Sequence, residues 1–148
     1  MRIYLGADHR GFELKEEIKI WLTENEYEVE DVGAFVLDPE DDYVDYALKV
    51  AESVEGGEDD KGILLCGSGH GVEIVANRFP YVRAILGFND EVTVQAREHE
   101  DANILVLAAE WVGTNEAMER VRMFLTAQKR DDVRYERRRV RMANLQIR

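Results

Sequence analysis

At 148 residues, 45% of them hydrophobic, the chain has the length of one domain and enough apolar side chains to bury a core. The net charge of −12 argues against broad nucleic-acid binding, and no apolar run approaches the roughly 18 residues of a membrane span. The single cysteine cannot form an internal disulfide, and the N-terminus reaches Asp8 too early for a secretory signal, so we expect a cytoplasmic protein.

Short apolar runs alternate with amphipathic stretches along the chain. The apolar runs predict strands at residues 2–7, 27–33, 61–66, 83–87 and 103–107. The amphipathic stretches predict helices at residues 11–25, 44–56, 70–79, 89–99, 114–127 and 132–144. The helix assignments rest on apolar spacing, because residues such as Leu14, Ile18 and Leu22 recur on one helical face.

This alternation predicts an α/β fold in three layers, with a Rossmann-like, doubly wound parallel sheet of five strands. Parallel strands need crossover connections, and the intervening helices then cover both faces of the sheet. The right-handed crossover rule and common precedent favour the strand order 2-1-3-4-5. We expect a single domain over residues 1–148, with polar connections at 37–42 and 55–62 and a basic C-terminal helix at about 132–144.

Charge is distributed unevenly between this acidic body and the C-terminal segment. From Arg120 to the end there are ten basic and three acidic residues, a net charge of +7, whereas the first 119 residues carry −19. The basic segment could be a solvated helix that offsets the charge of the body. Alternatively, it could be an anion site, either for a phosphorylated small molecule or within a contact between subunits.

Two polar clusters, GADHRG at 6–11 and CGSGHG at 66–71, follow the first and third predicted strands. Ligands of parallel α/β sheets bind beyond the carboxyl ends of the strands, so both clusters are expected at one edge. Asp8 alone would be interpreted as a helix N-cap, but Asp8 next to His9 at a strand end indicates a binding site.

The second cluster combines a lone cysteine with closely spaced glycines. The glycines lead into a predicted helix whose free N–H groups form a cradle for an anion, although tight turns also need glycine. No G-x-G-x-x-G follows the first strand and no Gly-Lys-Ser/Thr occurs, which argues against a dinucleotide or Walker loop. Cys66 could be a buried structural residue, but the helix dipole is expected to favour its thiolate. A thiolate beside backbone donors suits removal of a proton from a carbon next to a carbonyl.

With these motifs the chain resembles the type B ribose-5-phosphate isomerase family, which also contains the galactose-6-phosphate isomerase subunits. The resemblance runs nearly end to end, through GADHRGFELK, DDYVDYA, GILLCGSGHGVEIVANRFPYVRA, AREHEDANILVL and the arginine-rich tail. It implies an aldose–ketose isomerase that acts through a cis-enediolate without cofactor, with ribose 5-phosphate and ribulose 5-phosphate as the first choice. It also implies a homodimer or a dimer of dimers, in which the neighbouring subunit completes each site, and no nucleic-acid or membrane partner.

The resemblance assigns roles to individual residues. Cys66 matches the base that abstracts the proton, Ser68 matches a hydroxyl that assists at the enediol, and His99 matches the histidine that opens the sugar ring in the partner's site. The residues expected to bind substrate are Asp8, His9, Tyr43, Gly67, Gly69, His70, Gly71, Glu100, Glu110, Arg134 and Arg138. With three histidines and one cysteine, no spacing forms a convincing metal site, so we expect none.

The chain departs from the family pattern at Val44, which replaces a proline, and at two acidic positions. Glu100 stands where an asparagine is usual, and Glu110 stands where an arginine is usual. If the substrate is phosphorylated, we expect Glu110 to turn away or to pair with a tail arginine; otherwise it would bind sugar hydroxyls.

Two alternatives to the first-choice function stay open. The substrate could be a hexose phosphate, another pentose or tetrose phosphate, or a free sugar. The chain could also be a sugar-phosphate binding module without activity, although a binder would not need Cys66, Ser68 and His99 together. Arg134 and Arg138 lie four residues apart, on one helical face, and the neighbouring Arg137 and Arg139 leave this register open by one residue.

Overall fold

The computed structural model describes residues 1–55 and 59–145. In these ranges the strands are β1 (Arg2–Ala7), β2 (Glu28–Gly33), β3 (Lys61–Cys66), β4 (Ala84–Leu86) and β5 (Ile104–Ala108). The helices are α1 (Phe12–Glu24), α2 (Tyr43–Glu55), α3 (His70–Ala76), α4 (Asp90–Glu100), α5 (Thr114–Thr126) and α6 (Val133–Ala143). Every predicted element is present, with its described ends displaced by no more than three residues; residue 56 of the second predicted helix lies outside the described residues.

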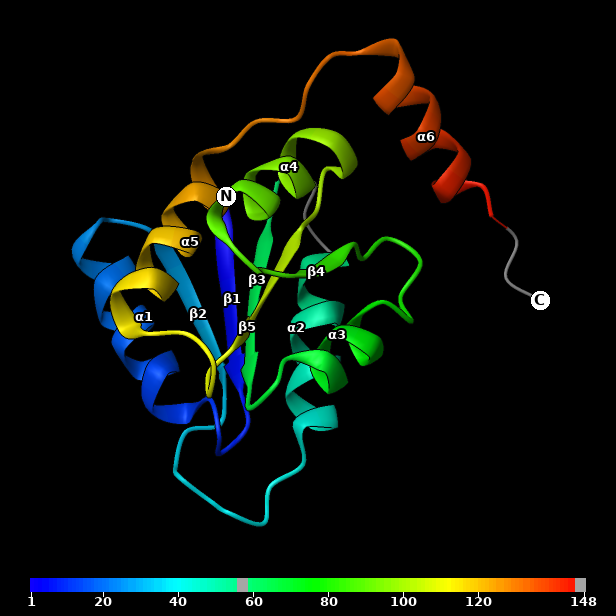
Figure 1. Cartoon of the computed structure of the whole chain (residues 1–148). Coiled ribbons are helices and arrows are strands. Elements are labelled where there is room, and N and C mark those ends of the chain that lie inside the picture. The colour runs from blue at the N-terminus through cyan, green and yellow to red at the C-terminus, as the bar shows by residue number, and fades with distance from the viewer. Residues whose placement is uncertain (56–58, 146–148) are drawn as a thin grey trace.

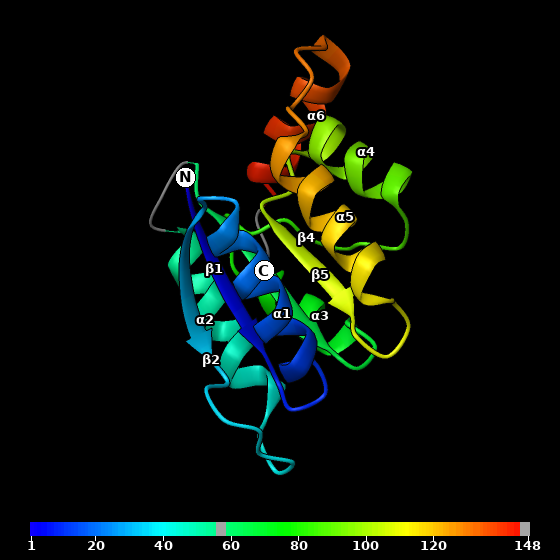
Figure 2. The same cartoon turned by 90° about the vertical axis from the view of Figure 1, so that its left-hand side faces the viewer.

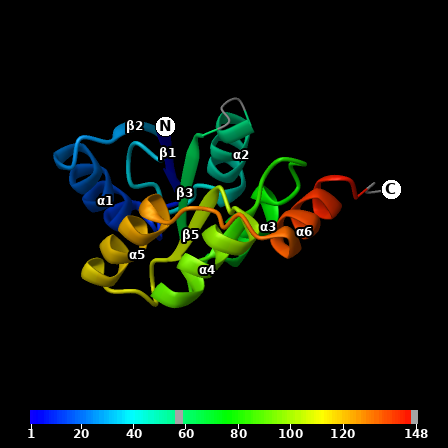
Figure 3. The ribbon, with the colours of Figure 1, turned by 90° about the horizontal axis from the view of Figure 1, so that it is seen from above.

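The strands pair in parallel and form one sheet between two layers of helices, as predicted (Figures 1 and 3). Helices α1, α4 and α5 lie on one face and α2 and α3 on the other. Because side chains alternate along a strand, each interior strand contributes to both cores. Leu105 and Leu107 pack toward α1 and α5, whereas Ile104 and Val106 pack toward α2 and α3.

The observed strand order is β2-β1-β3-β5-β4, so the predicted order 2-1-3-4-5 is wrong for the last two strands. β5 is buried on both faces from Ile104 to Leu107. Burial of this extent is typical of an interior strand of a parallel sheet, which has a neighbouring strand on each side. β4 has three residues and only Ala84 is buried, so it suits the edge of the sheet. Reading the strands in chain order missed this difference in burial.

Because β5 is the neighbour of β3, the ends of β1, β3 and β5 lie side by side. Ala7 is paired with Leu65 and Cys66 with Ala108. The loops that follow these three strands therefore meet at one edge of the sheet, which points downward in Figure 1. Gly11 lies directly against the backbone of Leu65, so close that a Cβ on Gly11 would lie 2.8 Å from the Leu65 carbonyl carbon.

Helix α6 lies near the opposite edge and extends away from the body of the protein (Figures 1 and 2). It packs on α4, and none of its residues is buried. The Asp132 side chain caps α6 by accepting a hydrogen bond of 2.8 Å from the Arg134 N–H, and Asn89 caps α4 in the same way. Across the described ranges, no helix is long and apolar enough to span a bilayer.

Candidate active site

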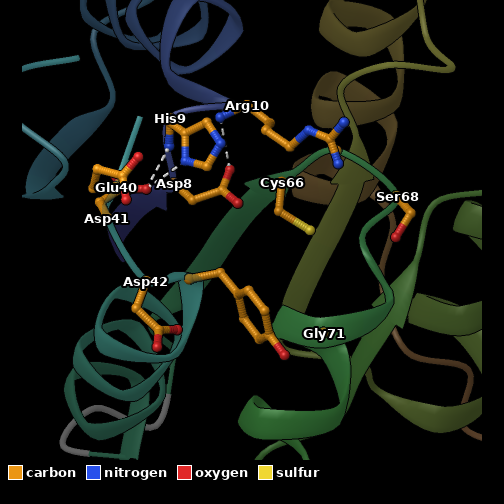
Figure 4. A pocket seen from close by; sticks show the side chains of 11 residues that line it. Asp8, His9, Arg10, Glu40, Asp41, Asp42, Cys66, Ser68 and Gly71 are labelled. Carbon is orange, nitrogen blue, oxygen red and sulfur yellow. Dashed lines mark hydrogen bonds and ion pairs between the residues drawn. The ribbon is translucent and has the colours of Figure 1, made fainter. Parts of the chain in front are cut away.

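A cavity of about 710 Å³ opens at the carboxyl ends of β1 and β3, with the start of α2 on its other side (Figure 4). It is lined by Asp8, His9, Arg10, Glu40, Asp41, Asp42, Tyr43, Cys66, Gly67, Ser68 and Gly71. The two polar clusters that the sequence placed at one edge are therefore brought together in one site.

Cys66 is the last residue of β3 and is only 5% exposed. Its Sγ accepts a hydrogen bond from the Gly69 N–H at 3.1 Å, which is the donor expected from the glycine turn. Burial nevertheless raises the pKa of the Cys66 thiol, and this outweighs the hydrogen bond from Gly69. The prediction that α3 favours the thiolate is therefore wrong in direction, because the strand end that holds the sulfur is enclosed by apolar side chains.

Two glycines of the turn are required by close packing. Gly69 has a φ of +82°, and a Cβ at this position would lie 2.6 Å from the Leu86 Cδ1. A Cβ on Gly71 would lie 2.6 Å from the ring of Tyr43. The absence of a side chain at Gly71 thus lets the Tyr43 ring lie over the turn at the cavity wall.

Asp8 does not cap α1, because the N-cap of this helix is Gly11, but it has a structural role in the turn before the helix. Its carboxylate accepts hydrogen bonds from the N–H groups of Arg10 and Gly11, at 3.0 and 3.1 Å, and so fixes the turn before α1. The side chain is buried, and burial raises the pKa of the Asp8 carboxyl. Asp8 lines the cavity and also holds the loop that carries its neighbours.

His9 is oriented by Asp41, a residue predicted to lie in a polar connection. The Asp41 Oδ1 lies 2.7 Å from the His9 Nδ1 and also accepts a hydrogen bond from the His9 N–H. The hydrogen bond to Asp41 raises the pKa of His9. Since Nδ1 is engaged, Nε2 is the ring nitrogen that can contact a ligand. The run LDPEDD at 37–42 shows that acidic side chains follow the second predicted strand, but not which of them reaches His9.

Ser68 is exposed at the rim of this cavity and also lines a second, more apolar cavity of about 440 Å³. His70, the other predicted residue of the turn, lines only the second cavity, together with Leu86 and Trp111. Gly67, at the start of the turn, lies in the wall of the first cavity between two side chains, Arg10 and Glu110.

Four predicted site residues lie far from Cys66, toward the opposite edge of the sheet: His99, Glu100, Arg134 and Arg138. His99 and Glu100 end α4, and this helix runs back to the edge where β5 begins, opposite the cavity. The His99 ring stacks on Tyr135 of α6, with ring centroids 4.2 Å apart and an interplanar angle of 12°. Arg138 lies over the same Tyr135 ring, so part of the basic helix joins His99 in a second group.

The contacts of α6 set Arg139 apart from the other arginines of this second group. Arg139 donates a hydrogen bond of 3.0 Å to the His99 carbonyl and its side chain is 10% exposed, so it holds α6 against α4. Arg134, Arg137 and Arg138 are all exposed, so exposure excludes Arg139 from the predicted pair and leaves the choice between Arg137 and Arg138 open. Arg134 pairs only loosely with Asp132, at 3.5 Å. None of the second group lines the first cavity within this described chain.

Glu110 is paired with Arg10 rather than with a tail arginine. The Arg10 Nε lies 2.7 Å from the Glu110 Oε1, and the Glu110 N–H donates to the Gly67 carbonyl at 3.1 Å. Among the described residues of one chain, α6 lies at the opposite edge from Glu110 (Figure 1), so the predicted pair with a tail arginine does not form within the chain. Among residues 1–55 and 59–145, no cluster of three or more His, Cys, Asp or Glu side chains could hold a metal ion.

The fold and the cavity define an α/β protein with a small-ligand site at the carboxyl edge of a parallel sheet. Residues 3–142 match the model of the ribose/galactose isomerase family, and the chain belongs to this family. It is 41% identical to ribose-5-phosphate isomerase B of Escherichia coli over 127 residues, which are 86% of this chain and 85% of that protein.

Solved structures agree with this assignment. A ribose 5-phosphate isomerase from Thermotoga maritima is 41% identical, with a TM-score of 0.91 over 97% of this chain and 98% of that one. Ribose-5-phosphate isomerase B from Mycoplasma genitalium, solved with bound ribulose 5-phosphate, is 34% identical, with a TM-score of 0.91 over 96% of this chain and 93% of that one.

Proposed function

We propose that the protein interconverts ribose 5-phosphate and ribulose 5-phosphate. The observation that carries this proposal is Cys66, a thiol at the end of a central strand, in a cavity whose wall includes Gly67, Ser68 and Gly71 of the glycine turn. The names of the similar isomerases, and the ribulose 5-phosphate bound in one of them, support the choice of a pentose phosphate.

In the proposed reaction Cys66 acts as the general base. Its thiolate takes the proton from C2 of the open-chain aldose, the electron pair moves to the carbonyl, and an enediolate forms. Cys66 then delivers the proton to C1 while a proton passes from the C2 oxygen to the C1 oxygen, which gives the ketose and restores the thiolate. The N–H groups of residues 67–71 hold the developing oxyanion, and the Ser68 hydroxyl is placed to exchange a proton with the enediol oxygens.

The ring-opening step calls on His99, which this chain places at the other edge of the sheet. We propose that the protein is a homodimer in which His99, Arg134 and Arg138 of one subunit complete the cavity of the other. The exposed position of both arginines and the projection of α6 from the body support this arrangement (Figure 1). A pair of such dimers would give a tetramer with the same sites.

The proposed reaction requires no metal ion or cofactor, because each proton is moved by a side chain. We also propose that it takes place in the cytoplasm, where Cys66, which is free in the structure, stays reduced.

The experiment that tests the function is a screen of turnover on ribose 5-phosphate, hexose phosphates, other pentose and tetrose phosphates, and the free sugars. Ribose 5-phosphate should give the highest kcat/KM, with and without a chelator, and Cys66→Ala should lower kcat by about 10² to 10⁴ or more. A higher kcat/KM on a hexose phosphate or a free sugar would show that this sugar, and not ribose 5-phosphate, is the preferred substrate. An unchanged kcat in Cys66→Ala would show that Cys66 is not the general base.

A further inference from the structure

The ion pair between Arg10 and Glu110 lies beside the turn that carries Cys66. Arg10 is in the loop after β1 and Glu110 is in the loop after β5, so the two side chains meet over the end of β3 between them. A Cβ on Gly67 would lie 3.1 Å from the Arg10 Cδ and 3.1 Å from the Glu110 Cδ. The pair is therefore in direct contact with the residue that follows Cys66.

Arg10 carries a positive charge in a cavity whose other charged side chains are mostly acidic. The lining contains four carboxylates, which belong to Asp8, Glu40, Asp41 and Asp42. Carboxylates in this number repel an anionic ligand unless a cation intervenes. Within the described lining, Arg10 is the one side chain with a permanent positive charge, because His9 is charged only when it is protonated.

Glu110 holds the Arg10 guanidinium in place and leaves part of its hydrogen-bond donors available to a ligand. The ion pair with Glu110 engages Nε, and among the described residues the two terminal nitrogens have no hydrogen-bond partner. The side chain is 57% exposed and extends across the cavity from the His9 side toward Cys66 and Ser68 (Figure 4). The two terminal nitrogens are thus free to donate to an oxyanion in bidentate fashion.

We propose that Arg10 binds the phosphate of the substrate and that Glu110 is the residue that positions Arg10. This inference rests on the proposed function, since it adds to the same site a residue that favours phosphorylated over free sugars from within the chain that carries Cys66. Glu110 would then support anion binding despite its negative charge, because it fixes the guanidinium in one orientation and so lowers the entropy lost on binding.

Arg10→Met keeps the length of the side chain and removes the charge and the donors. We expect KM for ribose 5-phosphate to rise by about ten- to hundredfold, with kcat changed less than about threefold, because a charge-assisted interaction made equally in ground and transition states is lost. The inhibition constant of inorganic phosphate should rise by a similar factor. That of free ribose should not change.

Glu110→Gln tests the positioning role. Alone it should raise KM by no more than about fivefold, as expected for loss of a half-exposed ion pair. Added to Arg10→Met it should have no further effect, because Glu110 acts through Arg10. A lower KM in Glu110→Gln would show that Glu110 simply repels the anion, and additive effects would show that it touches the substrate itself. Both results would overturn the positioning role.

The matched control is Arg122→Met, which removes the arginine of the exposed Arg122–Glu119 pair on α5 and should leave KM unchanged. An unchanged KM in Arg10→Met, or an equal loss of phosphate and ribose affinity, would overturn the role of Arg10. If the wild-type protein does not turn over ribose 5-phosphate, the proposed function fails by itself. Calorimetric binding of inorganic phosphate to wild type and Arg10→Met then decides the inference, because equal affinities would refute it.

Discussion

If each site uses Cys66 of one subunit and His99 of the other, two inactive variants should together form an active enzyme. In a two-fold dimer of Cys66→Ala with His99→Ala, one site receives both substitutions. The other site receives the intact Cys66 of the second chain and the intact His99 of the first. Purified heterodimers should therefore have about half of the wild-type specific activity.

The assay uses two affinity tags on coexpressed chains, so that heterodimers are isolated and their composition is checked by mass spectrometry before turnover is measured. The matched control pairs a wild-type chain with a Cys66→Ala/His99→Ala chain. There each site loses one residue, and the heterodimer should be inactive. The opposite outcome, with an inactive first pair and a half-active control, would place both residues in one chain and refute the shared site.

Three further predictions concern the chemistry and the fold. Because burial raises the pKa of Cys66 and the thiolate is the active form, kcat/KM should keep rising with pH beyond the ordinary thiol value of about 8.5; a plateau reached below it would contradict this pKa direction. Gly71→Ala should displace the Tyr43 ring and raise KM, with unfolding by urea little changed; an unchanged KM would exclude Tyr43 from the site. Lys15 is fully buried and pairs with Asp31 at 2.8 Å, so Lys15→Met should lower the free energy of unfolding by about 3 kcal/mol, as measured by urea unfolding. A loss below about 1 kcal/mol would show that the pair with Lys19 is enough to stabilise the Asp31 carboxylate.

The sequence was sufficient to predict the elements of the fold, because apolar periodicity and chain direction determine strands, helices and a parallel sheet. It was not sufficient to order β4 and β5, since this depends on how deeply each strand is buried. The residues at the ends of β1 and β3 were placed correctly for the same topological reason: parallel strands bring their carboxyl ends to one edge.

Contacts between loops were harder to predict than positions along the strands. The pairing of Arg10 with Glu110 follows from β5 lying beside β3, so the error in strand order concealed it. The role of Asp41 was missed because a polar loop gives no sign of which of its carboxylates turns inward. The direction of the Cys66 pKa shift was missed because a sequence shows the helix that follows a thiol but not the side chains that enclose it.

The stacking of His99 on Tyr135 couples ring opening to substrate binding under the proposed function. Under the proposed function, α4 carries the ring-opening histidine and α6 carries two arginines that complete the cavity of the other subunit. The stack joins these helices, and Arg139 holds them together as well. A substitution that loosens α6 would therefore disturb proton transfer and substrate affinity together. A new substrate specificity that evolved through changes in α6 would therefore alter turnover and binding together. Changes in the Arg10 loop, at the opposite edge of the sheet (Figure 1), would not act through this stack.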